Sequence, residues 1–310
     1  MKKIAILVLV VVVWVAIVIF IFEHVSNDAD TSWIHKKFLD ISYAYESPSE
    51  KLDIYYPNEG KGPFPVIISI HGGAFKFGDK ADTMLNPMLE GVKRGYVVIS
   101  INYRLSGEAK WPAQINDVKA AIKFIRANAK KLNLDPDKFA VWGGSAGGNL
   151  AALAGTSGDV KSLEDPNFGH ADVSSKVQAV VDWFGPINFL TMDKQWEVIG
   201  IDGQKHSDAN SFESQLMGQK ITDIPQLVES ANPEEYINGD EPPFYIQNGT
   251  ADKVIPSIQG EEFAQTLKAK SKNAVIFEYL KGAGHGDPAF ESKQNLDKIF
   301  AFLDKYLKQN

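Results

Sequence analysis

The chain has 310 residues, 44% of them hydrophobic, with 32 basic and 39 acidic side chains and a formal net charge of −7. This length fits one large α/β domain or two smaller ones, and the acidic balance offers no basic surface for nucleic acid. The absence of cysteine excludes disulfides, zinc–thiolate sites and cysteine nucleophiles.

An uninterrupted apolar run opens the sequence. Residues 4–22, IAILVLVVVVWVAIVIFIF, contain no charge, Gly or Pro, and as a helix they would span roughly 28 Å, close to the thickness of a bilayer core. A cleaved signal peptide usually has a shorter apolar region and a clear cleavage pattern. We therefore predict a membrane anchor over residues 1–25, with cleavage and secretion as the alternative. Because Lys2 and Lys3 precede the run, the positive-inside rule places the remainder outside the cytoplasm.

Residues 26–40 are polar and irregular, and we expect them to form a tether to a catalytic domain over residues 41–310. In that domain, short apolar runs typical of strands buried on both faces alternate with helical periodicity, for example after Pro112. This alternation predicts an α/β fold with a mainly parallel central sheet flanked by helices. The expected strands are KLDIYYP, FPVIISI, GYVVISI, KFAVW, VQAVVDW, PFYIQNG and AVIFEYL.

The stretch from about residue 188 to 236 is far longer than an ordinary connection between a helix and a strand. Its apolar residues are scattered and include Phe189, Trp196, Phe212 and Leu216. We expect a helical insertion that lies over one end of the sheet.

A serine surrounded by small residues follows the strand KFAVW. The segment Gly143-Gly144-Ser145-Ala146-Gly147 satisfies the pattern G-x-S-x-G, and the helix-forming sequence GNLAALAG follows it. In a strand–turn–helix context this pattern indicates a nucleophile elbow, a strained turn that exposes the serine hydroxyl. A flexible glycine loop is the alternative for this segment.

A second glycine pair follows an earlier strand, in the segment His71-Gly72-Gly73-Ala74. Backbone N–H groups of Gly72 and Gly73, together with that of Ala146, are candidate donors to an oxyanion. His71 lies too early in the chain to be the catalytic base of this pattern, and we expect it to hold the loop by a hydrogen bond.

The base and the acid are expected in the chain order serine, acid, histidine. His285 lies in the Gly-rich loop after the last strand, and Asp252 follows the strand PFYIQNG, so these two residues would orient and activate Ser145. Asp182 at the end of VQAVVDW is a rival acid. Asp287 is a second rival, although a local turn or cap role before Pro288 is favoured.

Two further histidines, His170 and His206, lie in polar stretches with no strand before them. We expect both to be solvated surface residues.

Taken together, these segments resemble the α/β-hydrolase-fold carboxylesterases, in the branch related to hormone-sensitive lipase and to bacterial acetyl and feruloyl esterases. The matching segments include PFPVIISIHGGAFKFGDK, LDPDKFAVWGGSAGGNLAAL, PPFYIQNGTADKVIP and GAGHG, and they cover nearly all of residues 41–310. The resemblance implies a serine esterase that forms an acyl-enzyme without a metal or cofactor. It also implies short-chain or sugar-linked esters, of acetyl or feruloyl type, as substrates.

Four aromatic residues are candidate walls of a substrate pocket, with ordinary core packing as an equal alternative: Phe75, Phe77, Trp183 and Phe184. The expected partners are a small-molecule or carbohydrate ester and, through the N-terminal helix, a membrane. One alternative function is an inactive hydrolase fold that serves as a tethered binding module, although Ser145, Asp252 and His285 are all present in order. Another is a dipeptidyl-peptidase-like serine peptidase, which normally carries an additional recognition domain.

Overall fold

The computed structural model describes residues 28–158 and 160–308. The predicted membrane anchor over residues 1–25 lies outside the described residues. Within the described ranges, no helix is both long enough and apolar enough to cross a bilayer.

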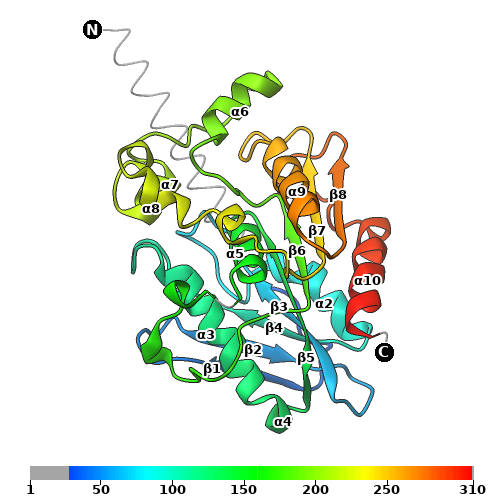
Figure 1. Ribbon diagram of the computed structural model, residues 1–310. Helices are drawn as coiled ribbons and strands as arrows, with labels where there is room; N and C mark the ends of the chain where they lie inside the picture. The colour runs from blue at the N-terminus through cyan, green and yellow to red at the C-terminus, as the bar shows by residue number, and fades with distance from the viewer. Residues whose placement is uncertain (1–27, 159, 309–310) are drawn as a thin grey trace, which may run out of the picture.

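The described chain is organised around an eight-stranded sheet with the strand order β1-β2-β4-β3-β5-β6-β7-β8 (Figure 1). Strands β1, β2 and β4 pair antiparallel, and every pair from β4 to β8 is parallel. The predicted mainly parallel sheet is thus confirmed, and all seven predicted strands are present among the described elements. The strands are β1 (Lys37–Ser42), β2 (Lys51–Tyr55), β3 (Phe64–Ile70), β4 (Val97–Ile101), β5 (Leu134–Gly144), β6 (Ala179–Trp183), β7 (Phe244–Gly249) and β8 (Val275–Leu280).

Successive strand residues point to opposite sides of the sheet. Both faces are therefore apolar, and helices cover both. In β3, Val66 and Ile68 belong to one buried cluster and Ile67 to the other. Apolar residues of α3 (Ala113–Ala127), α5 (Ala146–Thr156) and α9 (Ile258–Lys270) pack into the first cluster. Those of α2 (Asn86–Lys93) and α10 (Lys293–Leu307) pack into the second. The short helix α4 (Ala129–Leu132) leads into β5.

The predicted helical insertion is present between β6 and β7. It contains α6 (Met192–Ile199), α7 (Phe212–Met217) and α8 (Pro225–Glu229), connected by turns and loops. Figure 1 shows these helices beyond the carboxyl end of the parallel strands, on the same side as the start of α5. Asn149 of α5 connects the insertion to the helix that follows Ser145, since its Nδ2 donates to the carbonyl of Ala231 at 3.2 Å.

The structure corrects the predicted tether for residues 28–40. The N–H of Ala29 donates to the carbonyl of Ala81 at 2.7 Å, Ile34 is buried, and β1 starts at Lys37 and pairs with β2. The strand has no clear sequence signal because it lies at the edge of the sheet with half of its residues exposed and none buried. It therefore lacks the apolar alternation that marks a half-buried strand.

One carboxyl group lies in the core beneath α5. Oδ1 of Asp182, in β6, accepts the N–H of Gly185 at 3.0 Å, and Oδ2 has no partner among the described residues. A Cβ on Gly148 of α5 would overlap this carboxyl group. Burial raises the pKa of Asp182 to about 7, although the bond from Gly185 acts in the opposite direction.

This raised pKa predicts a pH-dependent cost to stability. The folded protein holds the Asp182 proton more tightly than the unfolded chain, so the free energy of unfolding decreases from about pH 4 to about pH 7. Asp182→Asn keeps the acceptor for Gly185 and removes the ionisable group. We expect the variant to be more stable than the wild type at pH 8, by at most about 4 kcal/mol, and nearly equal at pH 4.

Urea unfolding at both pH values measures this difference. Asn in place of the exposed Asp202 is the matched control and should leave the difference near zero at each pH. A stability difference for Asp182→Asn that does not change with pH would contradict the raised pKa.

Candidate active site

Ser145 lies in a strained turn between β5 and α5. Its backbone has φ 57° and ψ −125°, a conformation that a non-glycine residue adopts only when its surroundings enforce it. A Cβ on Gly143 would overlap the carbonyl of Gly147, and a Cβ on Gly147 would overlap the carbonyl of Ile70 in β3. The two glycines are therefore required by close backbone packing, which confirms the strand–turn–helix context predicted for G-x-S-x-G.

Ser145, His285 and Asp252 form a continuous hydrogen-bonded chain. The Oγ of Ser145 lies 2.9 Å from Nε2 of His285, and Nδ1 of His285 lies 2.8 Å from Oδ2 of Asp252. The second carboxylate oxygen of Asp252 accepts the N–H groups of Val254 at 2.7 Å and Ile255 at 3.0 Å. A carboxylate at Nδ1 places the ring proton there, so Nε2 is free to accept the serine proton.

Neither rival carboxylate takes this position. Oδ1 of Asp182 accepts the N–H of Gly185 instead. Asp287 accepts the N–H of Ala289 at 2.9 Å, which is the local turn role expected for it. Among the described residues, no group of three or more His, Asp or Glu side chains has the arrangement of a metal site.

The loop after β3 lies directly beside the nucleophile. A Cβ on Gly72 would be 3.3 Å from the Cβ of Ser145, and Gly73 has φ 105°, which favours glycine. The N–H groups of Gly73 and Ala146 have no backbone acceptor among the described residues. Two backbone donors near Ser145 are thus available to a substrate oxygen.

His71 is buried and holds this loop, as expected. Its Nδ1–H donates to the carbonyl of Gly72 at 2.8 Å, and its ring stacks on Tyr103 with centroids 4.4 Å apart. Burial lowers the pKa of the His71 imidazole, although the bond to Gly72 opposes this. A neutral ring that donates from Nδ1 suits a structural role.

The four candidate pocket aromatics have different surroundings. The ring of Phe184 lies 4.6 Å from that of His285, between centroids, and a Cβ on Gly144 would be 3.2 Å from it. Phe77 is 37% exposed and meets Phe212 of α7 edge-to-face.

Phe75 and Trp183 show the alternative expected for these aromatics, because both pack as ordinary core residues. Phe75 is 1% exposed and belongs to the first buried cluster. Trp183 belongs to the second, and its Nε1–H donates to Gln247 at 2.8 Å.

Two residues near the site carried no sequence signal as functional residues. The Cε of Met84 would be 2.7 Å from a Cβ on Gly72 and 3.8 Å from one on Gly144, so this methyl group lies close to the nucleophile. His206, expected at the surface, is fully buried; its polar sequence context reflects polar partners inside the fold. His170 is exposed, as expected.

The BD-FAE family model matches residues 52–267, more than two thirds of the chain. The chain belongs to the BD-FAE family. It is an α/β-hydrolase-fold member of the carboxylesterase branch related to hormone-sensitive lipase.

Proteins similar to this chain include named esterases. Esterase LipQ of Mycobacterium tuberculosis is 32% identical over 79% of this chain, and the match spans 56% of LipQ. The chain thus spans just over half the length of this relative. A truncated form of a carbohydrate esterase from gut microbiota has a TM-score of 0.82 and 31% identity, covering 91% of this chain and 100% of that one. A bifunctional GH43-CE protein of Bacteroides eggerthii has a TM-score of 0.78 and 36% identity, covering 87% and 35% respectively.

The packing of the turn predicts a large effect of one methyl group. Gly147→Ala would overlap the Ile70 carbonyl, and because the neighbour is backbone it can give way only if α5 moves from β3. We expect a destabilisation of about 3 kcal/mol, at the upper end of overpacking effects, in chemical unfolding. Gly107→Ala is the control, since a Cβ there meets no atom within 4 Å; an equal effect of both substitutions would contradict the steric argument.

Proposed function

We propose that the protein is a serine carboxylic ester hydrolase. The observation that carries the proposal is the hydrogen-bonded chain from Ser145 through His285 to the buried Asp252. Membership of the BD-FAE family and similarity to named esterases support the same reaction.

The geometry suits a two-step reaction through an acyl-enzyme. Ser145 Oγ attacks the ester carbonyl carbon while His285 Nε2 takes its proton, and Asp252 stabilises the resulting imidazolium. The carbonyl oxygen gains negative charge and accepts hydrogen bonds from the N–H groups of Gly72 or Gly73 and of Ala146. Collapse of the tetrahedral intermediate breaks the ester C–O bond, and the departing alcohol takes the proton from His285. Water then repeats the sequence on the acyl-enzyme and releases the acid.

We further propose that the substrates are short-chain or sugar-linked esters. Met84 and Phe184 both approach Gly144, next to the nucleophile, which favours a small acyl group such as acetyl. Similarity to a carbohydrate esterase supports a sugar alcohol on the other side of the ester bond. The apolar run at residues 4–22 supports a location at the outer side of a membrane, with the described domain outside the cytoplasm.

The contacts argue against the alternative of an inactive binding module. A binding module does not require a strained serine 2.9 Å from an imidazole that is itself bound by a buried carboxylate.

A fluorophosphonate probe tests the nucleophile directly. We expect the wild-type protein to be labelled at Ser145 and to hydrolyse p-nitrophenyl acetate. Ser145→Ala should lose both properties, and His285→Ala should reduce kcat by at least about 10³-fold, because the serine then has no base. Mass spectrometry of the labelled peptide identifies the site. A wild-type protein that takes no label and hydrolyses no ester would favour the binding module.

The proximity of Met84 to the nucleophile predicts an effect on acyl length. Met84→Ala removes the methyl group beside Gly72, and each methylene that a pocket accepts contributes about 1 kcal/mol or more. We expect the ratio of kcat/KM for p-nitrophenyl butyrate to that for the acetate to rise about tenfold. Met88→Ala, a truncation of a buried methionine in α2, is the control and should leave this ratio unchanged. An unchanged ratio in Met84→Ala would place the acyl group elsewhere.

A further inference from the structure

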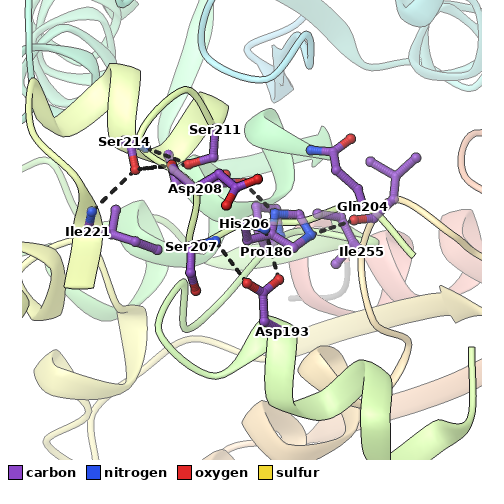
Figure 2. A network of polar contacts seen from close by, with 12 residues as sticks. Pro186, Asp193, Gln204, His206, Ser207, Asp208, Ser211, Ser214, Ile221 and Ile255 are labelled. Carbon is purple, nitrogen blue, oxygen red and sulfur yellow. Dashed lines mark hydrogen bonds and ion pairs between the residues drawn. The ribbon is translucent and has the colours of Figure 1, made fainter. Parts of the chain in front are cut away.

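A buried polar network connects the insertion to the loop that carries Asp252. Figure 2 shows His206 at its centre, with Asp193 of α6 below it and Ser211 and Ser214 at the start of α7 beside it. The side chain of His206 is fully buried, with 0% exposed. Such a group must have its hydrogen bonds satisfied within the protein.

Both ring nitrogens of His206 are engaged. Nδ1 lies 2.9 Å from Oε1 of Glu213 in α7, and Nε2 lies 2.9 Å from the carbonyl oxygen of Val254. The backbone N–H of His206 donates to Oδ1 of Asp193 at 2.8 Å. Trp196 of α6 stacks on the ring, with centroids 6.4 Å apart. The imidazole is thereby held between α6, α7 and the loop after β7.

The carbonyl that His206 binds belongs to the residue that holds the acid. The N–H of Val254 donates to Oδ1 of Asp252 at 2.7 Å. One position earlier, the carbonyl of Lys253 accepts the N–H of Gln204 at 2.9 Å. Two hydrogen bonds from the insertion therefore attach to the two residues that follow Asp252.

Helix α7, which carries Glu213, also contacts the loop after β3 that carries Gly73 (the Gly73 loop). Gln215 of α7 accepts a hydrogen bond from Nζ of Lys76 at 2.6 Å, and Phe212 packs edge-to-face on Phe77 with centroids 6.1 Å apart. The N–H groups of Lys76 and Phe77 both donate to the carbonyl of Gly73 at 2.9 Å. Helix α7 thus contacts the Gly73 loop through Gln215 and Phe212 and binds His206 through Glu213.

We propose that His206 is a positioning residue, which acts with α7 to hold the Asp252 loop and the Gly73 loop in one fixed arrangement around Ser145. This inference rests on the proposed esterase function. Under this inference, the insertion helps to set the positions of the catalytic loops relative to Ser145.

The charge state of His206 decides whether both bonds exist. Glu213 accepts at Nδ1 and the Val254 carbonyl accepts at Nε2, so both bonds require the protonated ring. Burial acts to lower the pKa of His206, but the hydrogen bond and charge of Glu213 and the charge of Asp193 outweigh it and raise the pKa. On the acid loop, the charged residues Asp252 and Lys253 directly precede the bound Val254. At alkaline pH the neutral ring keeps one N–H and loses one of the two bonds.

Steady-state kinetics with p-nitrophenyl acetate and the rate of fluorophosphonate labelling test the proposal. We expect His206→Gln to lower kcat and the labelling rate together by about tenfold, with KM within about twofold, in protein whose circular dichroism matches the wild type. The exposed His35, changed to Gln, is the matched control and should leave all three unchanged.

The pH profile separates positioning from general destabilisation. In the wild type we expect kcat to fall at alkaline pH as His206 loses its proton. Glu213→Gln removes the main partner that raises the pKa of His206, so this fall should move to lower pH. If His206→Gln does not fold, the Glu213→Gln profile decides the question alone, and an unmoved profile overturns the proposal.

A double-mutant cycle tests the link through α7. Lys76→Met removes the bond to Gln215. If α7 couples the two loops, the double variant with His206→Gln loses less activity than the product of the two single losses. If the wild type is labelled and active, and the double variant shows the product of the two single losses, the coupling is overturned. A wild type that takes no label would instead refute the esterase function on which the inference rests.

Discussion

The backbone contact between the start of α5 and the end of β3 is the constraint on which the rest of the site depends. Gly147 lies so close to the Ile70 carbonyl that no side chain fits between them. Because the Gly72–Gly73 loop begins two residues after Ile70, this contact also sets the distance from Ser145 to the loop. Nucleophile and oxyanion donors are therefore placed by one steric condition, and the strained φ of Ser145 is the conformational cost of meeting it.

The parallel sheet supplies the remaining components. Strands β3, β5 and β7 end at the same edge, and the loops that follow them carry Gly73, Ser145 and Asp252. Loops that follow neighbouring parallel strands meet at the carboxyl edge, where α/β folds place their sites. Chain order and strand ends were therefore enough to predict from the sequence which residues come together. The prediction needed no knowledge of how the helices pack.

Other features could not be predicted because their signals are not local. Trp183 and Phe184 are adjacent aromatics at the end of β6 and belong to the same buried cluster, yet Trp183 meets Trp142 while Phe184 meets His285. The turn that follows, where Phe184 has φ 43°, brings the next ring to His285. His206 is surrounded by polar letters, and only the fold reveals that its partners, Glu213 and the Val254 carbonyl, are buried with it. The edge strand β1 has no apolar face to mark it.

Local hydrogen bonds explain the shape of each catalytic loop but leave open where the loops lie relative to one another. Asp252 closes its own loop by accepting two N–H groups, and Gly73 closes the other in the same way. The contact between Gly147 and the Ile70 carbonyl fixes only the position of the Gly73 loop relative to Ser145. The Asp252 loop needs a separate reference, and α7 supplies one because it contacts the Gly73 loop through Gln215 and reaches the Asp252 loop through His206. A segment that is irregular in sequence and lies outside the sheet can thus be as necessary to the geometry as the strands that carry the reacting groups.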